Sequence, residues 1–133
     1  MEQPVNQLEL ETFTEAFLNA VNSDVFGGYP TPTAAFALST LVAINDECSK
    51  FYFAKKDLIA NDFAFANDFA LAGYLFFHTR NGSGTFFSDV DFPNHGAELL
   101  EYSQTFGEFE AYQGDDELIY AVGYENYPIQ VKA

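Results

Sequence analysis

The stretch LFFHTRNGSGTFFSD, from Leu75 to Asp89, decides the fold that we predict for this chain. Two pairs of phenylalanines flank a short polar break that begins with Asn-Gly. Residues that favour β-structure on both sides of an Asn-Gly step are the strongest local signal for a β-hairpin. The sequence therefore predicts hairpin arms at 74–79 and 85–88, joined by a turn in which four residues have a structural role: Arg80, Asn81, Gly82 and Gly84.

Helices are predicted before this hairpin. Apolar residues recur at helical spacing from Pro4 to about Asn22, which favours an amphipathic helix. Glycines and prolines in 25–33 interrupt regular structure and predict a connector. Thr33 can cap a second helix over 34–44, and a third follows to about residue 59. These two segments can also form one longer helix with a bend near Asn45.

A helix and a second hairpin are predicted after the first hairpin. The segment 95–106 has Leu99, Leu100 and Phe106 as an inner face, and Gly107 is a typical stop. Residues 108–113 alternate in polarity, 114–117 form a turn, and 118–122 return as the second arm. We thus predict one α+β domain over 1–133, mostly helical in 1–71 and hairpin–helix–hairpin in 72–123. Its N-terminal helices pack on a small, mainly antiparallel sheet.

The charge balance is the most unusual property of the sequence. There are 20 acidic and 5 basic residues, a formal net charge of −15, yet 48% of residues are hydrophobic and 18% are aromatic. So apolar a chain can build a core, which argues against a disordered acidic tail. A strongly negative surface repels nucleic acid and anionic lipid, because both are bound through Lys and Arg. The expected partner is therefore a basic protein surface.

The acidic residues are concentrated in the C-terminal half, where ten carboxylates lie between Asp89 and Glu125. A charged side chain can present its carboxylate to a partner when the fold beneath it is rigid. We therefore predict that an acidic surface of this half contacts the partner. Its members are Glu98, Glu101, Glu108, Glu110, Asp115, Asp116 and Glu117.

Several motifs raise the question of catalysis or metal binding, and each has a simpler interpretation. The pair Gly82 and Gly84 lacks the spacing of a phosphate loop, and a turn explains both glycines. The run 115–117 has oxygen ligands for a hard cation but not the spacing of a calcium loop, so a solvated turn is the expectation. Cys48 lies among acids that oppose thiolate formation. We predict no metal site, no cofactor and no enzyme activity.

The only arginine, Arg80, is also interpreted structurally. It can grip a carboxylate of a partner, but the favoured hypothesis is an ion pair with Asp89 or another acid across the hairpin. A single cysteine cannot form an internal disulfide, and the N-terminal residues lack the features of a signal peptide. These features, with the absence of any apolar run of membrane-spanning length, predict a cytoplasmic protein.

The segment 72–120 contains Ala72-Gly73, Phe77, Thr79-Arg80-Asn81-Gly82, Gly84 and Phe86-Phe87, and later Gly107-Glu108, the run 111–116 and Leu118-Ile119-Tyr120. In these residues it resembles a family of small phage and prophage proteins of uncharacterised activity. Ser83 stands where that family often has His, and Glu117 replaces its usual Gly. The resemblance implies a phage origin, and a phage-encoded protein of this kind is expected in the cytoplasm of the host cell.

Two functions fit these features. The first is a small accessory protein that binds and inhibits a host nucleic-acid-binding or defence protein, such as a CRISPR or restriction complex, by imitating nucleic-acid charge. The second is a non-enzymatic adaptor or assembly module that docks on a partner, or on a second copy as a homodimer, through exposed aromatic surface. Its candidate contacts are Tyr112, Tyr120, Tyr124 and Tyr127. We favour the first.

Overall fold

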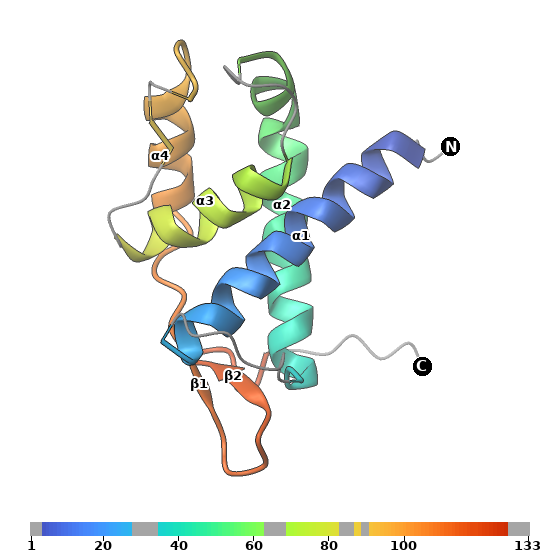
Figure 1. Ribbon diagram of the computed structural model, residues 1–133, viewed down its shortest axis with the longest axis vertical. Coiled ribbons are helices and arrows are strands. Elements are labelled where there is room, and N and C mark those ends of the chain that lie inside the picture. The colour runs from blue at the N-terminus through green and yellow to red at the C-terminus, as the bar shows by residue number, and fades with distance from the viewer. Residues whose placement is uncertain (1–3, 28–34, 63–68, 83–86, 89–90, 128–133) are drawn as a thin grey trace.

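The computed structural model describes residues 4–27, 35–62, 69–82, 87–88 and 91–127 (Figure 1). Within these ranges the chain forms four helices and one two-stranded antiparallel sheet, so the fold is α+β and mostly helical. The elements, in chain order, are α1 Pro4–Val25, α2 Leu38–Asp62, α3 Phe69–Asn81, α4 Gly96–Gln104, β1 Ala111–Gln113 and β2 Ile119–Ala121.

The core is built where α1, α2 and α3 pack together, and it is aromatic. Phe13 and Phe17 of α1, Phe51 of α2, and Phe76 of α3 have no exposed surface. The rings of Phe51 and Phe76 stack with their centroids 4.3 Å apart. Aromatic rings bury large apolar areas, and such pairs add a favourable contact energy. The core therefore lies between helices, whereas the sequence predicted that the N-terminal helices would pack on a sheet.

The first predicted hairpin is wrong in its first arm, because Tyr74–Thr79 lies within α3. The phenylalanines of this segment have β-propensity, but burial against α1 and α2 outweighs it. Gly82, at φ +61°, directly follows the last helical residue, Asn81. A glycine with positive φ ends helices as readily as it forms hairpin turns, so the Asn-Gly signal marks a helix end. Gly84 and most of the predicted second arm lie outside the described residues, while Phe87 and Ser88 are described and are not in a strand.

Gly73 allows α3 to approach α1 closely. A Cβ atom at this position would lie 2.1 Å from the carbonyl oxygen of Phe13, so only glycine fits. Further along both helices, the ring of Phe17 meets that of Phe77 edge-on at 5.5 Å. The contacts advance in the same direction on both helices, so α1 and α3 run in parallel sense. Their C-terminal ends consequently lie on the same side of the molecule (Figure 1).

The remaining predictions of regular structure agree better with the fold. The first helix is confirmed as α1, and the segment after the connector is one long helix, α2. Helix α4 buries Leu99, and Gly107 takes a positive φ of 80° shortly after its end. Thr33, the predicted cap, lies outside the described residues.

The C-terminal hairpin forms as predicted, with a shorter ladder. Strands β1 and β2 pair through Ala111↔Ala121, Tyr112↔Tyr120 and Gln113↔Ile119. The chain before α2 adds a parallel bridge, in which Ile119 donates to the carbonyl of Ala35 at 2.9 Å. This hairpin lies at one end of the long axis of the molecule, and α4 lies toward the other end (Figure 1).

Candidate functional site

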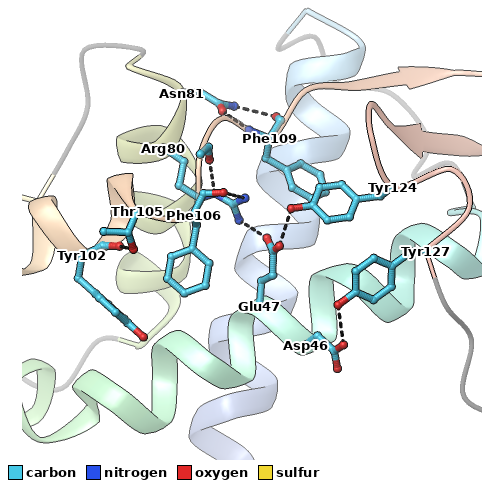
Figure 2. A network of polar contacts seen from close by, with 11 residues as sticks. Asp46, Glu47, Arg80, Asn81, Tyr102, Thr105, Phe106, Phe109, Tyr124 and Tyr127 are labelled. Atoms are coloured by element: carbon cyan, nitrogen blue, oxygen red, sulfur yellow. Dashed lines mark hydrogen bonds and ion pairs between the residues drawn. The ribbon is translucent and has the colours of Figure 1, made fainter.

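Arg80 organises the region in which the predicted acidic residues begin. Its side chain has no exposed surface, and its Nη1 lies 2.8 Å from Oε1 of Glu47 on α2. Nε donates to the carbonyl of Gly107 at 2.8 Å and Nη2 donates to that of Phe106 at 3.3 Å (Figure 2). Arg80 thus pairs with an acid of the same chain, but that acid is on α2 and not across a hairpin, and Arg80 itself lies in α3 and not in a hairpin turn. Asp89 lies outside the described residues.

Aromatic rings surround the Arg80 guanidinium and exclude water from it. Its Cζ lies between 5.1 and 5.8 Å from the ring centroids of Phe17, Phe76, Phe106 and Phe109. The contact between Nη1 and Oε1 of Glu47 is an ion pair without hydrogen-bond geometry, so attraction between the charges holds it. Tyr124 donates its hydroxyl to the other oxygen of Glu47 (Figure 2). Burial, followed by the bond to Glu47, raises the pKa of Tyr124.

Asn81 holds the chain that follows α4 in an extended form. Its Oδ1 accepts from the backbone N–H of Phe109 at 2.7 Å, and its Nδ2 donates to the carbonyl of Phe109 at 3.0 Å (Figure 2). The ring of Phe109 is buried, while Glu108 and Glu110 on either side are exposed. Side chains alternate in direction along extended backbone, so one buried ring places both carboxylates on the outer side.

Glu108 and Glu110 line a cavity of about 350 Å³, which we call the acidic pocket. Its lining is Asp24, Asn81, Glu108, Phe109 and Glu110. Asp24 is in the last turn of α1, and Asn81 ends α3. Two helix C-termini therefore meet at this pocket, and each adds a partial negative charge to the carboxylates. The potential in the pocket favours a cationic group, such as the end of a Lys or Arg side chain.

His78 lies near this pocket but does not neutralise it. It lines a neighbouring cavity together with Asp24 and Tyr74. Burial lowers the pKa of His78, and the charge of Asp24 opposes that shift. A lowered pKa keeps the imidazole neutral at physiological pH. His78 therefore places no positive charge beside Asp24.

The other predicted acidic residues lie elsewhere. Glu98 on α4 lies 2.8 Å from Nζ of Lys55 and 3.3 Å from Nδ1 of His95. Both contacts lower the pKa of Glu98, and the contact with Lys55 has the larger effect. Glu101 is exposed on the same helix. Because α4 lies toward the end of the molecule away from the β-hairpin, these two residues are not brought to the acidic pocket (Figure 1).

The turn of the hairpin carries the last three predicted residues, Asp115, Asp116 and Glu117, all exposed. Asp116 accepts from the hydroxyl of Tyr120 and from the backbone N–H of Leu118, and these bonds lower the pKa of its carboxyl. Glu117 has a positive φ of 70°. The turn is therefore shaped by its own hydrogen bonds, as the solvated-turn interpretation expects.

Tyrosine hydroxyls also bond acidic side chains in other parts of the molecule. Tyr52 donates to Glu9 at 2.7 Å, Tyr127 donates to Asp46 at 2.8 Å, and Tyr112 donates to Glu125 at 3.0 Å. The rings of Tyr112 and Tyr120 stack across the two strands with centroids 5.8 Å apart. The tyrosines predicted as docking contacts thus make internal contacts. These bonds satisfy carboxylate oxygens but leave their negative charge in place.

Within the parts of the chain that the structure describes, no three His, Cys, Asp or Glu side chains are placed to hold a metal ion. Cys48 is fully buried, and burial raises the pKa of its thiol far above the ordinary value. A buried thiol with a raised pKa is not a nucleophile at neutral pH.

Asp24 is the residue of the candidate site that the sequence analysis did not find. Its proximity to Glu108 and Glu110 arises from the parallel packing of α1 and α3, for which the sequence offers Gly73 as the single local signal.

Comparison with protein-family models, with curated proteins and with solved structures finds no match. None of the helices in the described ranges is both long and apolar enough to span a membrane.

Proposed function

We propose that this protein is a non-enzymatic binding protein that holds a basic surface of a partner protein at its acidic pocket. The observation that carries the proposal is the arrangement of Asp24, Glu108 and Glu110 around one cavity, with no basic side chain in the described lining. A Lys or Arg side chain of the partner can enter a cavity of this size and pair with these carboxylates. The hairpin turn after β1 carries three further exposed acids, Asp115, Asp116 and Glu117, which do not line this pocket.

The class of partner follows from the charge pattern. Proteins that bind DNA or RNA present Lys and Arg to phosphates spaced about 1.7 Å per charge along duplex. Carboxylates held on a rigid fold can occupy those basic residues in place of phosphates. We therefore propose an inhibitor of a nucleic-acid-binding or defence protein, acting in the cytoplasm of a host cell. A phage origin, which the resemblance of 72–120 implies, is part of the same proposal.

The support for rigidity comes from contacts beneath the acidic pocket. Asn81 fixes both backbone groups of Phe109, and Arg80 fixes the carbonyls of Phe106 and Gly107. Charged groups on an ordered backbone lose little conformational freedom when a partner binds, which improves affinity. The adaptor hypothesis has less support, because the hydroxyls of its candidate tyrosines are bonded to carboxylates within the chain.

The proposal is tested by binding of the full chain to a panel of purified basic nucleic-acid-binding proteins over a range of salt concentrations. Affinity for at least one of them should fall steeply with salt, because exposed charges are screened. Duplex DNA should compete for the same surface. Binding to no member of the panel, binding that survives about 1 M salt, or binding unaffected by DNA would contradict charge mimicry.

A further inference from the structure

A second cavity, of about 470 Å³, lies between α1 and α2 and shares no lining residue with the acidic pocket. We call it the α1–α2 groove. Its apolar lining is Leu10 and Leu18, which are partly buried against the core. Its remaining lining is polar or acidic and consists of Glu11, Thr14, Glu15, Asn45 and Ser49.

Helical spacing explains how these residues form one elongated surface. Leu10, Thr14 and Leu18 are separated by four residues each, so they form a row along α1. Glu11 and Glu15 form the neighbouring row, on the more exposed side. Asn45 and Ser49 form a row on α2 across the groove. The groove thus has an apolar wall with two carboxylates at its rim.

Exposed apolar side chains continue the surface beyond one end of the groove. Phe53 is four residues after Ser49 on α2 and is 55% exposed. Leu8 is on α1, one turn before Glu11, and is 64% exposed. The hydroxyl of Tyr52 donates a hydrogen bond to Glu9, which brings these two parts of the helices together. Phe53 directly follows Tyr52 in the sequence, and Leu8 directly precedes Glu9. Apolar side chains gathered beside a groove are typical of interaction surfaces.

The charges of the groove select its occupant. A second copy of this chain would place its own acidic residues opposite Glu11 and Glu15, and each copy carries −15, so self-association is opposed by repulsion. An anionic lipid surface is repelled for the same reason. A helix with an apolar stripe flanked by Lys or Arg complements both the apolar wall and the acidic rim.

We propose that the α1–α2 groove binds an amphipathic basic helix of a partner protein. The apolar stripe of that helix packs on Leu10 and Leu18, and its Lys or Arg side chains pair with Glu11 and Glu15. This interaction surface is independent of the acidic pocket, and it stands whether or not the acidic pocket binds a partner.

The test uses the full chain and two labelled synthetic peptides of about five helical turns. Both contain the same leucines and lysines. In the first peptide the leucines form one helical stripe, and in the second they are scrambled. Fluorescence anisotropy at about 0.15 M salt should show binding of the striped peptide at least several-fold tighter. Chemical-shift changes should be concentrated at 10–18 and 45–49.

A pair of variants with equal charge separates the groove from general attraction. Asn45→Arg with Ser49→Arg places two cations in the groove, and these repel the lysines of the striped peptide. The affinity for that peptide should therefore fall by about tenfold, which corresponds to about 1.4 kcal/mol. Gln104→Arg with Asn126→Arg adds the same charge at exposed positions outside the groove and should have little effect. Circular dichroism checks that both variants fold.

Three results would overturn the proposal: equal affinity for the two peptides, equal loss in the two variants, or a dimer in sedimentation that the groove substitutions abolish. If Asn45→Arg with Ser49→Arg prevents folding, the exposed pair Glu11→Gln and Glu15→Gln replaces it. Its matched control is Glu98→Gln with Glu101→Gln on α4. The rim variant should then weaken binding of the striped peptide more than the control, and equal effects would again reject the groove.

Discussion

The guanidinium of Arg80 on α3 lies 2.8 Å from the carboxylate of Glu47 on α2, and no part of the Arg80 side chain is exposed. The same arginine binds the carbonyls of Phe106 and Gly107, between α4 and the acidic pocket. One cation therefore connects two core helices to the segment that carries Glu108. In a chain with 20 acidic residues, a buried arginine at this position links the stability of the core to the geometry of the surface.

Replacement of Arg80 should destabilise the fold strongly. Arg80→Ala leaves the mostly buried Glu47 without its cation, and loss of one member of a buried ion pair costs about 3–5 kcal/mol. Urea unfolding measures the change. The control is Lys55→Ala, which breaks the more exposed pair with Glu98 and should destabilise the fold clearly less. Similar losses in both variants would mean that Arg80 is not a central contact of the core.

Gly73 should tolerate no side chain. In Gly73→Ala the new methyl group meets the carbonyl oxygen of Phe13, so α3 must move away from α1. Overpacking of this kind costs about 1–3 kcal/mol. Thermal unfolding should show a clear decrease in Tm, whereas Ala70→Leu on the exposed face of α3 should change the stability by about 0.5 kcal/mol or less. A Gly73→Ala variant as stable as the parent would refute the close approach of the two helices.

Asn81 should be required for the shape of the acidic pocket. Asn81→Ala removes the side chain that bonds the N–H and the carbonyl of Phe109, and unsatisfied backbone groups cost about 1–3 kcal/mol. Hydrogen exchange at the Phe109 amide should accelerate, and affinity for a basic partner should fall. Asn126→Ala, at an exposed position, serves as the control. Unchanged exchange at Phe109 would show that the bond from Asn81 does not hold this segment.

Stability should decrease at alkaline pH because of the bonds between tyrosines and carboxylates. Burial and the bond to Glu9 raise the pKa of Tyr52, and the bond to Asp46 raises the pKa of Tyr127 to about 12. An unfolded tyrosine loses its proton near pH 10, so above that pH the unfolded chain binds fewer protons than the folded chain. The free energy of unfolding must therefore fall between pH of about 10 and 12.

Urea unfolding over this pH range checks the alkaline prediction, together with Tyr52→Phe and Tyr127→Phe. Each substitution removes one group whose pKa differs between the folded and unfolded states, so each should make the decrease in stability less steep. If both variants lose stability with pH as steeply as the parent, these hydrogen bonds do not contribute to the pH dependence.

Local patterns predicted the elements whose own residues determine them. The apolar spacing from Pro4 to about Asn22 predicts α1, and the alternation in 108–113 with a polar turn predicts the C-terminal hairpin. The same alternation explains why Glu108 and Glu110 are exposed beside the buried Phe109. These features require no knowledge of distant contacts.

Helix α3 could not be predicted in this way, because its phenylalanines and the glycine at its end are each compatible with a hairpin and with a helix. Phenylalanines favour strands in isolation but fill a helical core when Phe13 and Phe17 of α1 pack on them. A glycine with positive φ serves in hairpin turns and at helix ends, and Gly82 ends α3. The ion pair of Arg80 with Glu47 and the position of Asp24 follow from this helix, so both were also missed.

The most direct test of the acidic pocket compares variants with equal charge. Glu108→Gln with Glu110→Gln removes two charges from the pocket, and Glu98→Gln with Glu101→Gln removes two from α4. Affinity for an arginine-rich peptide, measured by calorimetry at about 0.15 M salt, should fall by about tenfold or more in the first variant and by less than about threefold in the second. Equal losses in the two variants would mean that net charge alone attracts the peptide, which would contradict a defined site at Asp24, Glu108 and Glu110.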